Sequence, residues 1–159
     1  MGKQARAIAE LSLKDLVKDL NKAYADEWLA FYLYWYMAQT VSGKAYEDMK
    51  EMLEKIAKDE LEHAEELADL ITKLGDVPPS NPMDLEKNAN APYIMPPKNT
   101  ADINRIIRIV TEAEASAIEV YHKIAKKTAG KDHVTYQLVT HILSEEVTHE
   151  EMFENLLER

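Results

Sequence analysis

Cysteine is absent from this chain of 159 residues. The sequence therefore offers no disulfide framework, no thiolate metal ligand and no thiol nucleophile, and any metal ion must be held by oxygen and nitrogen atoms. The first residues, MGKQARAIAE, lack the apolar stretch of a secretory signal, and the longest dense apolar run, WLAFYLYWYMA at 28–38, is too short to span a bilayer. We expect a cytoplasmic protein with no membrane partner.

Proline and glycine are confined to a few places. All six prolines lie between Pro78 and Pro97, and three of the four glycines fall where long helices would end. The remaining sequence predicts helices over about 13–42, 44–74, 101–129 and 133–157. Their amino-terminal caps are expected at Ser12, which forms a capping box with Asp15, and at Thr100 and Asp132.

The spacing of these helices predicts the fold class. The connections are short, long and short, which indicates an all-α four-helix bundle of two antiparallel hairpins joined by one long proline-rich crossover. We expect a single domain over residues 1–159, with an N-terminal tail at 1–12 and the crossover loop at 75–100.

Positive charge is in the minority. The chain has 19 Lys and Arg against 29 Asp and Glu, and a formal net charge of −10. This balance repels nucleic-acid phosphate and attracts cations, so it disfavours a nucleic-acid partner. Lys3 and Arg6 are the basic residues of the N-terminal tail, which we interpret as solvated.

Two segments 87 residues apart repeat one arrangement of metal-capable side chains. In each copy a Glu precedes a Tyr by seven residues, and a Glu-x-x-His motif follows 33 or 32 residues after the first Glu. Residues spaced by three or seven share a helix face, so each copy presents three ligands and a tyrosine along one line. The two sets are Glu27, Tyr34, Glu60 and His63, and Glu114, Tyr121, Glu146 and His149.

Facing each other, the copies provide four carboxylates and two imidazoles, enough for two divalent cations. We predict that Glu60 and Glu146 bridge the cations, that Glu27 and Glu114 are terminal ligands, and that His63 and His149 each cap one ion. The acidic residues Asp59 and Glu145 are candidate acceptors for the second ring nitrogen of these histidines. Tyr34 and Tyr121 either hydrogen-bond a terminal carboxylate, supply an electron, or simply pack in the core.

Other residues compete for these roles. Glu119 and His122 also form a Glu-x-x-His motif, but Glu119 lies about 140° around the helix from Glu114, so we assign this pair to a flank. Glu112 is an alternative to Glu114 that breaks the spacing to the tyrosine. We interpret His122, His133 and His141 as partly exposed or interface residues. The alternative to a di-metal site is that the residues of the repeated set are ordinary surface charges on amphipathic helices.

The aromatic residues of 28–36 surround their predicted helix instead of forming one stripe. A helix that is apolar on every side is buried on every side. One side serves the bundle core, so we expect another to contact a second copy in a homo-oligomer.

The segments that carry these residues are DEWLAFYLYW, DELEHAEEL, EAEASAIEVY and ILSEEVTHEEMF. They resemble the four helices of ferritin-like proteins, in particular the Dps-like group called thioferritins, which has a bacterioferritin-type di-iron site inside each subunit. The resemblance implies a shell of about 12 subunits that oxidises Fe(II) with hydrogen peroxide or dioxygen and stores ferric mineral. It implies two iron ions per subunit, with Mn or Zn as substitutes, on Glu27, Glu60, His63, Glu114, Glu146 and His149.

Three features depart from the relatives that the chain resembles. Leu61 stands where bacterioferritins have a haem-binding methionine, so we predict no haem. The sequence ends ten residues after His149, without the fifth helix of bacterioferritins, which favours the smaller shell. Ala91 and Ser116 stand where thioferritins carry a cysteine pair, which leaves the thiol-linked redox behaviour of that group in doubt.

Two other functions remain open at the level of sequence. The first is a di-metal peroxidase or di-manganese catalase that stores no mineral; rubrerythrin is disfavoured because its second iron site needs cysteines. The second is a metal-free helical scaffold, for which the repeated ligand set would be coincidental.

Overall fold

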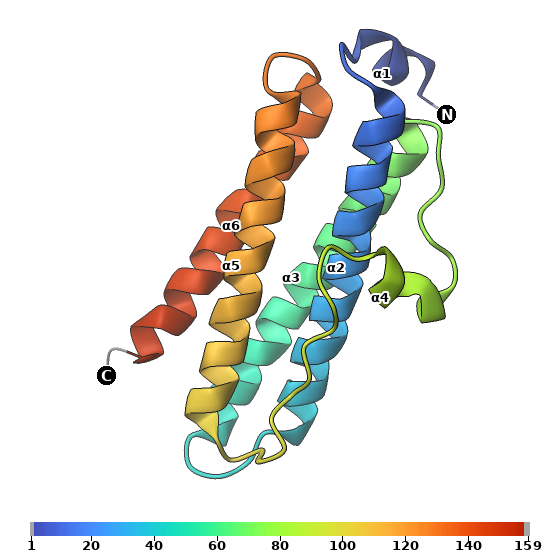
Figure 1. Ribbon diagram of the computed structural model, residues 1–159. Coiled ribbons are helices and arrows are strands. Elements are labelled where there is room, and N and C mark those ends of the chain that lie inside the picture. Colours follow the sequence, from blue (N-terminus) through green and yellow to red (C-terminus); the bar gives the residue numbers. More distant parts are fainter. Residues whose placement is uncertain (1, 158–159) are drawn as a thin grey trace.

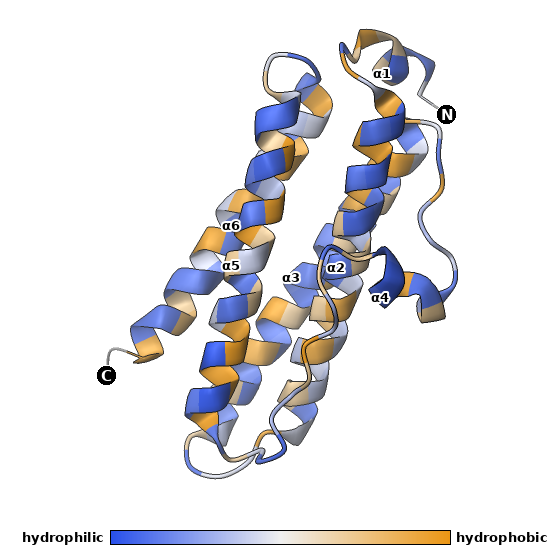
Figure 2. Cartoon of the chain, viewed as in Figure 1, coloured by the Kyte–Doolittle hydropathy of each residue, from blue (hydrophilic) through white to orange (hydrophobic). Residues whose placement is uncertain are grey.

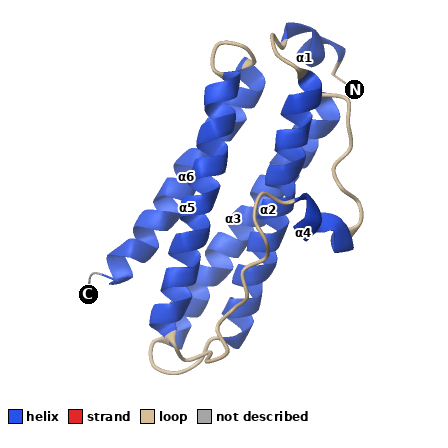
Figure 3. Ribbon diagram, viewed as in Figure 1, coloured by secondary structure: helices blue, strands red, loops and turns tan. Residues whose placement is uncertain are grey.

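The computed structural model describes residues 2–157, and every regular element within them is a helix (Figure 3). The four long helices are α2 (Leu13–Thr40), α3 (Tyr46–Lys73), α5 (Ile103–Thr128) and α6 (His133–Leu157). Three short elements accompany them, namely α1 (Lys3–Ile8), the 3-10 turn η1 (Pro82–Asp84) and α4 (Leu85–Asn88).

The long helices form the predicted bundle of two antiparallel hairpins. Helix α2 packs along α3, and α5 packs along α6. The segment between α3 and α5 returns along the outside of α2 to the opposite end of the bundle (Figure 1). The prediction of a ferritin-like bundle with one long crossover is therefore confirmed.

The helix ends follow local sequence signals. The Ser12 side chain accepts a hydrogen bond from the Asp15 amide, and Asp132 accepts from the Val134 and Thr135 amides, which satisfies amides that have no partner inside the helix. Gly43 lies between the first two long helices with a φ of 88°, a conformation that favours glycine. The predicted cap at Thr100 is wrong. Asp102 caps α5 by accepting from Arg105, and α5 consequently begins at Ile103.

The N-terminal tail and the crossover each contain a short helix. In the tail, residues 3–8 form α1, none of which is buried, and the Glu10 amide donates to the Lys131 carbonyl at 2.8 Å. In the crossover, Asn81 accepts a hydrogen bond from the Met83 amide and initiates η1 and α4. Proline is compatible with a first helical turn, where its missing N–H is not needed, so Pro82 permits a helical turn that the proline content had argued against.

Two apolar clusters fill the bundle, one on each side of a polar layer. One cluster contains Leu33, Met37, Leu53, Val110 and Phe153, and the other contains Leu16, Leu20, Leu67, Ile124 and Val139, all buried. Hydrophobic and hydrophilic residues alternate along the helices that enclose them (Figure 2). Burial of these side chains, roughly 1.5–3 kcal/mol each for Val, Leu, Phe and Met, holds the helices at the spacing that the polar layer requires.

Part of the aromatic run on α2 remains outside the core. Tyr32, Trp35 and Tyr36 are 51%, 45% and 38% exposed, and the rings of Tyr32 and Trp35 lie 6.1 Å apart.

Over residues 2–157, no helix combines the length and apolar character needed to cross a membrane.

Candidate metal centre

The polar layer contains one acidic side chain from each long helix and a histidine from two of them. Glu27 lies on α2 and Glu114 on α5; Glu60 and His63 lie on α3, and Glu146 and His149 on α6. Each of the six residues is at most 3% exposed. The sequence brings them together because each helix turns its ligand line toward the bundle axis, which is the arrangement of ferritin-like di-iron and di-manganese proteins.

The six side chains divide into two overlapping groups. Glu27, Glu60, His63 and Glu146 offer one ligand atom each within 4.8 Å of one another, and so do Glu60, Glu114, Glu146 and His149. The two groups share Glu60 and Glu146. In both shared residues one carboxylate oxygen faces His63 and the other faces His149, which is compatible with the prediction that Glu60 and Glu146 bridge two cations.

Each histidine turns the same ring nitrogen inward. His63 Nδ1 lies 3.1 Å from Glu146 Oε1 and 3.5 Å from Glu27 Oε2. His149 Nδ1 lies 3.6 Å from Glu60 Oε1 and 3.6 Å from Glu114 Oε2. The two rings are 6.3 Å apart between centroids, so one imidazole faces each ligand group.

The outer nitrogen of each histidine contacts an acidic residue of the other hairpin. His63 Nε2 on α3 lies 2.8 Å from Glu145 Oε2 on α6, and His149 Nε2 on α6 lies 3.2 Å from Asp59 Oδ2 on α3. A carboxylate at Nε2 fixes a proton on that nitrogen, so that Nδ1 is the nitrogen whose lone pair becomes available to a metal ion when the imidazole is neutral. The exposed His141 approaches the same Glu145 oxygen, at 3.6 Å.

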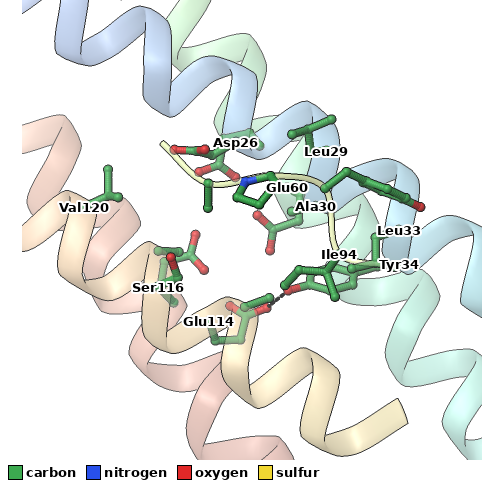
Figure 4. Close-up of a pocket in the computed structure, with 17 residues that line it drawn as sticks. Asp26, Leu29, Ala30, Leu33, Tyr34, Glu60, Ile94, Glu114, Ser116 and Val120 are labelled. Atoms are coloured by element: carbon green, nitrogen blue, oxygen red, sulfur yellow. Dashed lines mark hydrogen bonds between the residues drawn. The ribbon is translucent and has the colours of Figure 1, made fainter. Parts of the chain in front are cut away.

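The two tyrosines also cross the bundle. The Tyr34 hydroxyl on α2 donates to Glu114 Oε1 at 2.5 Å (Figure 4), and the Tyr121 hydroxyl on α5 donates to Glu27 Oε1. Burial, together with the nearby carboxylates, raises the pKa of both hydroxyls well above the usual value. The tyrosines therefore keep their protons and fix one oxygen of each predicted terminal glutamate, leaving the second oxygen for another partner.

That second oxygen makes no hydrogen bond in either glutamate. Seven buried atoms of the six side chains have no hydrogen bond: Glu27 Oε2, Glu60 Oε1, His63 Nδ1, Glu114 Oε2, Glu146 Oε1, Glu146 Oε2 and His149 Nδ1. Buried polar atoms are nearly always paired, because an unpaired one costs about 1–3 kcal/mol and more when charged. Oxygen and nitrogen atoms without hydrogen bonds in this number, divided between the two ligand groups, fit a pair of divalent cations.

The pKa values of several side chains in this layer differ strongly from their usual values. Burial, with repulsion from Glu146, raises the pKa of Glu60 well above its usual value, and burial raises that of Glu114 to about 8 despite the opposing effect of His149. Burial lowers the pKa of His149, but the facing carboxylates outweigh it and raise the value to about 12; the pKa of His63 is raised for the same reason. The same imidazoles lower the pKa of Glu146 to about 2 against the effect of burial. Without metal, therefore, Glu60, Glu114 and the two histidines retain protons, which supply the positive charge that the layer otherwise lacks.

The competing residues lie elsewhere. Glu119 and His122 are exposed on α5, and the Glu119 carboxylate lies 3.6 Å from Lys123 Nζ. Glu112 and His133 are also exposed. Helical periodicity therefore correctly placed the Glu-x-x-His motif of Glu119 and His122 on the outer face of its helix.

A cavity borders the four carboxylates (Figure 4), and neither histidine is among the residues that line it. It lies between α2 and α5 under residues 91–94 of the crossover, and all four glutamates line it. Sequence reasoning missed this feature and the contact that holds its cover, in which the backbone amide and side-chain nitrogen of Asn90 donate to the two oxygens of Asp26 at 2.8 and 2.5 Å. Ala91 and Ser116, the positions that we set against the thioferritin cysteine pair on the basis of the sequence resemblance, both line the cavity.

The bundle and its carboxylate–histidine layer define the class of ferritin-like helical proteins. A model of the ferritin-like domain matches residues 17–159, and the chain belongs to this family, as a Dps-like member.

Three similar proteins illustrate the relationship. The DNA protection during starvation protein of Pyrococcus furiosus is 33% identical over 147 residues, which cover 92% of this chain and 79% of the relative. A structure described as a dodecameric thioferritin from Bacteroides fragilis has a TM-score of 0.89 and 34% identity, covering 94% of this chain and 88% of the other. A ferritin-like di-iron carboxylate protein from Bacillus anthracis has a TM-score of 0.78 and 25% identity, covering 92% and 99%.

Proposed function

We propose that this chain is a ferroxidase that binds two Fe(II) ions per subunit, oxidises them with hydrogen peroxide or dioxygen, and retains the ferric product inside a protein shell. The function removes both reactants of damaging iron–peroxide chemistry. The observation that carries the proposal is the set of seven unpartnered buried oxygen and nitrogen atoms in two ligand groups that share Glu60 and Glu146.

The charges of the site suit this substrate. Four carboxylates carry a charge of −4 when ionised, which two divalent cations balance; unbalanced, each buried charge would cost several kcal/mol. In the proposed arrangement Glu60 and Glu146 hold both ions, Glu27 and Glu114 hold one each, and the Nδ1 atoms of the histidines complete the two groups. Tyr34 and Tyr121 orient the terminal carboxylates through their hydroxyl groups.

Bound as a pair, Fe(II) supplies two electrons at one location, which matches the two-electron reduction of a peroxide. Two Fe(II) ions become two Fe(III) ions, one hydrogen peroxide molecule becomes two waters, and two protons are taken up. The carboxylates stabilise the more highly charged product better than the substrate, because their attraction grows with the charge of the ion.

Storage requires a closed assembly, for which we propose a shell of twelve copies. The structural relative from Bacteroides fragilis is described as dodecameric. The exposed Tyr32, Trp35 and Tyr36 supply an aromatic surface on α2 of the kind that subunit contacts use. The net charge of −10 favours accumulation of Fe(II) by the shell.

An anaerobic titration with Fe(II), followed by separate addition of hydrogen peroxide and dioxygen, tests the chemistry. We expect saturation at two Fe(II) per chain and rapid oxidation by one of the two oxidants. Native mass measured before and after iron loading tests the shell, which should retain ferric product on gel filtration. A monomer would overturn storage, and absence of stoichiometric Fe(II) binding would overturn the ferroxidase.

Fast peroxide consumption by the Mn(II)-loaded protein, with no retained iron, would instead identify a di-manganese catalase. The same ligand set is used by di-iron and di-manganese proteins, so this alternative differs from our proposal in the metal and in storage, and peroxide consumption by the Mn(II)-loaded protein together with iron retention distinguishes the two.

A further inference from the structure

The cavity between α2 and α5 has walls built from equivalent positions of the sequence repeat. Counting from Glu27 and Glu114, the residues three further along are Ala30 and Ala117, and those six further along are Leu33 and Val120; all four line the cavity. The alanines are too small to fill the space between the two helices. The cavity is therefore a consequence of the repeat that also creates the ligand set.

The cavity connects the protein surface to the carboxylates. Ala91 and Ser116 line it and are exposed, whereas Glu27, Glu60 and Glu114 line it and are buried. Its mouth is therefore between the crossover and α5, and its inner end is at the site. Figure 4 shows Leu29, Ala30 and Leu33 on the α2 side, Ser116 and Val120 on the α5 side, and the carboxylates of Glu60 and Glu114 directed between them.

The space suits a small molecule. It offers about 80 Å³ to the centres of water-sized molecules, and about 10–15 Å³ of such space admits one water. A molecule of two oxygen atoms fits with room to move. The unpartnered oxygens of Glu60, Glu114 and Glu146 lie on residues that line this space, so a guest that reaches its inner end meets the ligand groups directly.

The walls disfavour an ion. Between mouth and carboxylates they consist mostly of Leu, Ala, Val, Ile and Pro side chains, which cannot replace the hydration shell that a divalent cation would lose. Asp26 is the one further carboxylate among the described lining residues, and Asn90 occupies both of its oxygens. That contact, with the Tyr93 amide bonded to Glu86 Oε1 at 3.0 Å, holds the crossover over the cavity.

The opposite side of the centre has the reverse character. Beyond the histidines lie Asp59 and Glu145, whose side chains are 27% and 44% exposed, with His141 next to Glu145. The two carboxylates attract cations. The site thus has an acidic face on α3 and α6 and an apolar approach between α2 and α5.

We propose that the cavity is the binding pocket and entry route of the uncharged oxidant, hydrogen peroxide or dioxygen, and that Fe(II) reaches the site from elsewhere. The proposal rests on the ferroxidase function above and adds to it a separate place for the second substrate. Ala117 determines the width of the pocket and Ser116 its mouth.

The first test uses xenon, an uncharged apolar probe, and requires no catalysis. Crystals of the metal-free or Zn(II)-loaded protein are exposed to xenon under pressure. We expect xenon in the cavity of the wild type and none there in Ala117→Leu, whose longer side chain fills the space. The control is Ala115→Leu, the same substitution at an exposed residue of α5 that does not line the cavity. Xenon missing from the wild-type cavity would overturn the proposal.

The second test separates oxidant from iron. Ala117→Leu should slow oxidation by hydrogen peroxide and by dioxygen about tenfold or more, while the rate and stoichiometry of anaerobic Fe(II) binding match those of Ala115→Leu. Comparing the two oxidants shows which one uses the pocket. Ser116→Leu, at an exposed position, should slow oxidation in the same way and replaces Ala117→Leu if that variant fails to assemble.

The outcomes distinguish this proposal from the function on which it rests. Oxidation at the wild-type rate by both oxidants in a variant that excludes xenon would overturn the pocket and leave the ferroxidase intact. Slower anaerobic Fe(II) binding in the same variant would show that iron also uses the cavity, which contradicts the separate routes. A wild-type protein that binds xenon but oxidises no Fe(II) would overturn the ferroxidase and, with it, the assignment of the oxidant.

Discussion

His63 Nε2 on α3 and Glu145 Oε2 on α6 lie 2.8 Å apart and join the two hairpins at the outer edge of the polar layer. His149 and Asp59 repeat this contact in the opposite sense, at 3.2 Å. Because each imidazole is oriented by the other hairpin, the ligand geometry and the docking of the hairpins depend on one another.

Replacing the outer carboxylate should weaken metal binding. In Glu145→Ala the His63 ring loses the acceptor that fixes its tautomer and orientation, and loss of such partners typically lowers metal affinity about 10–100-fold. Calorimetric titration with Zn(II) measures the change. Glu119→Ala, an exposed acidic residue on another helix, should bind as the wild type does. Equal weakening in both variants would show that net charge, and not His63 orientation, is responsible.

Removal of a predicted bridge should have a larger effect. Glu146→Ala and Glu60→Ala each delete a carboxylate common to both ligand groups, so we expect both ions to be affected and fast Fe(II) oxidation to be lost. The reduction should exceed the roughly 10–100-fold cost of losing an outer partner. Stopped-flow absorbance of the ferric product gives the rate. Activity in Glu146→Ala equal to that of the Glu119→Ala control would refute the assignment of the bridge.

The cross-bundle tyrosines should contribute to stability. Tyr34→Phe leaves Glu114 Oε1 buried without its donor, which costs about 1–3 kcal/mol. Urea unfolding of the metal-free protein measures this loss, and Tyr32→Phe, at a half-exposed ring, is the control. An unchanged free energy of unfolding in Tyr34→Phe would indicate that Glu114 acquires another partner.

If Tyr34 also supplies an electron, the Tyr34→Phe variant should lose a tyrosyl radical signal during Fe(II) oxidation.

The helices and the inward residues were predictable because their signals are local. Capping residues, glycines and the confined prolines bound the long helices, and a repeat spaced by multiples of the helical turn placed eight side chains on the inner faces. Glu119 and His122 satisfy the same short motif, and the helical angle alone was enough to place them outside.

The remaining features depend on contacts between distant residues. Nothing near Asp26 in the sequence indicates that it accepts hydrogen bonds from Asn90, 64 residues away. Likewise, a seven-residue spacing relates Tyr34 to Glu27, whereas the hydroxyl bonds Glu114 across the bundle. The cavity had a sequence signal, the alanines at equivalent positions of the repeat, but small residues in helices are common and have meaning only once the facing helix is known.

Proton binding in the metal-free site should make its stability depend on pH. The raised pKa values of Glu60 and Glu114 contribute stability that is complete below the usual value of 4.5 and is lost as pH rises through the folded-state pKa, about 8 for Glu114. The raised pKa of His149 adds a loss that begins above 6.5. The lowered pKa of Glu146 contributes stability that is lost only as pH falls below 4.5 toward about 2. From about pH 5 to 8, the site should therefore become steadily less favourable without metal.

Metal should reverse this trend, because it binds the deprotonated ligands and replaces the protons with fixed positive charge. We expect the increase in Tm on adding Zn(II), a redox-inert ion, to be larger near pH 7.5 than near pH 5. The increase should shrink in the double variant Glu27→Gln, Glu114→Gln, in which the layer loses two charges while keeping its volume. The matched control, Glu112→Gln with Glu119→Gln, removes two exposed charges from α5 and should retain the full increase. An equal rise in Tm at both pH values, or one that survives the Glu27 and Glu114 substitutions, would mean that Zn(II) stabilises the chain at a different place.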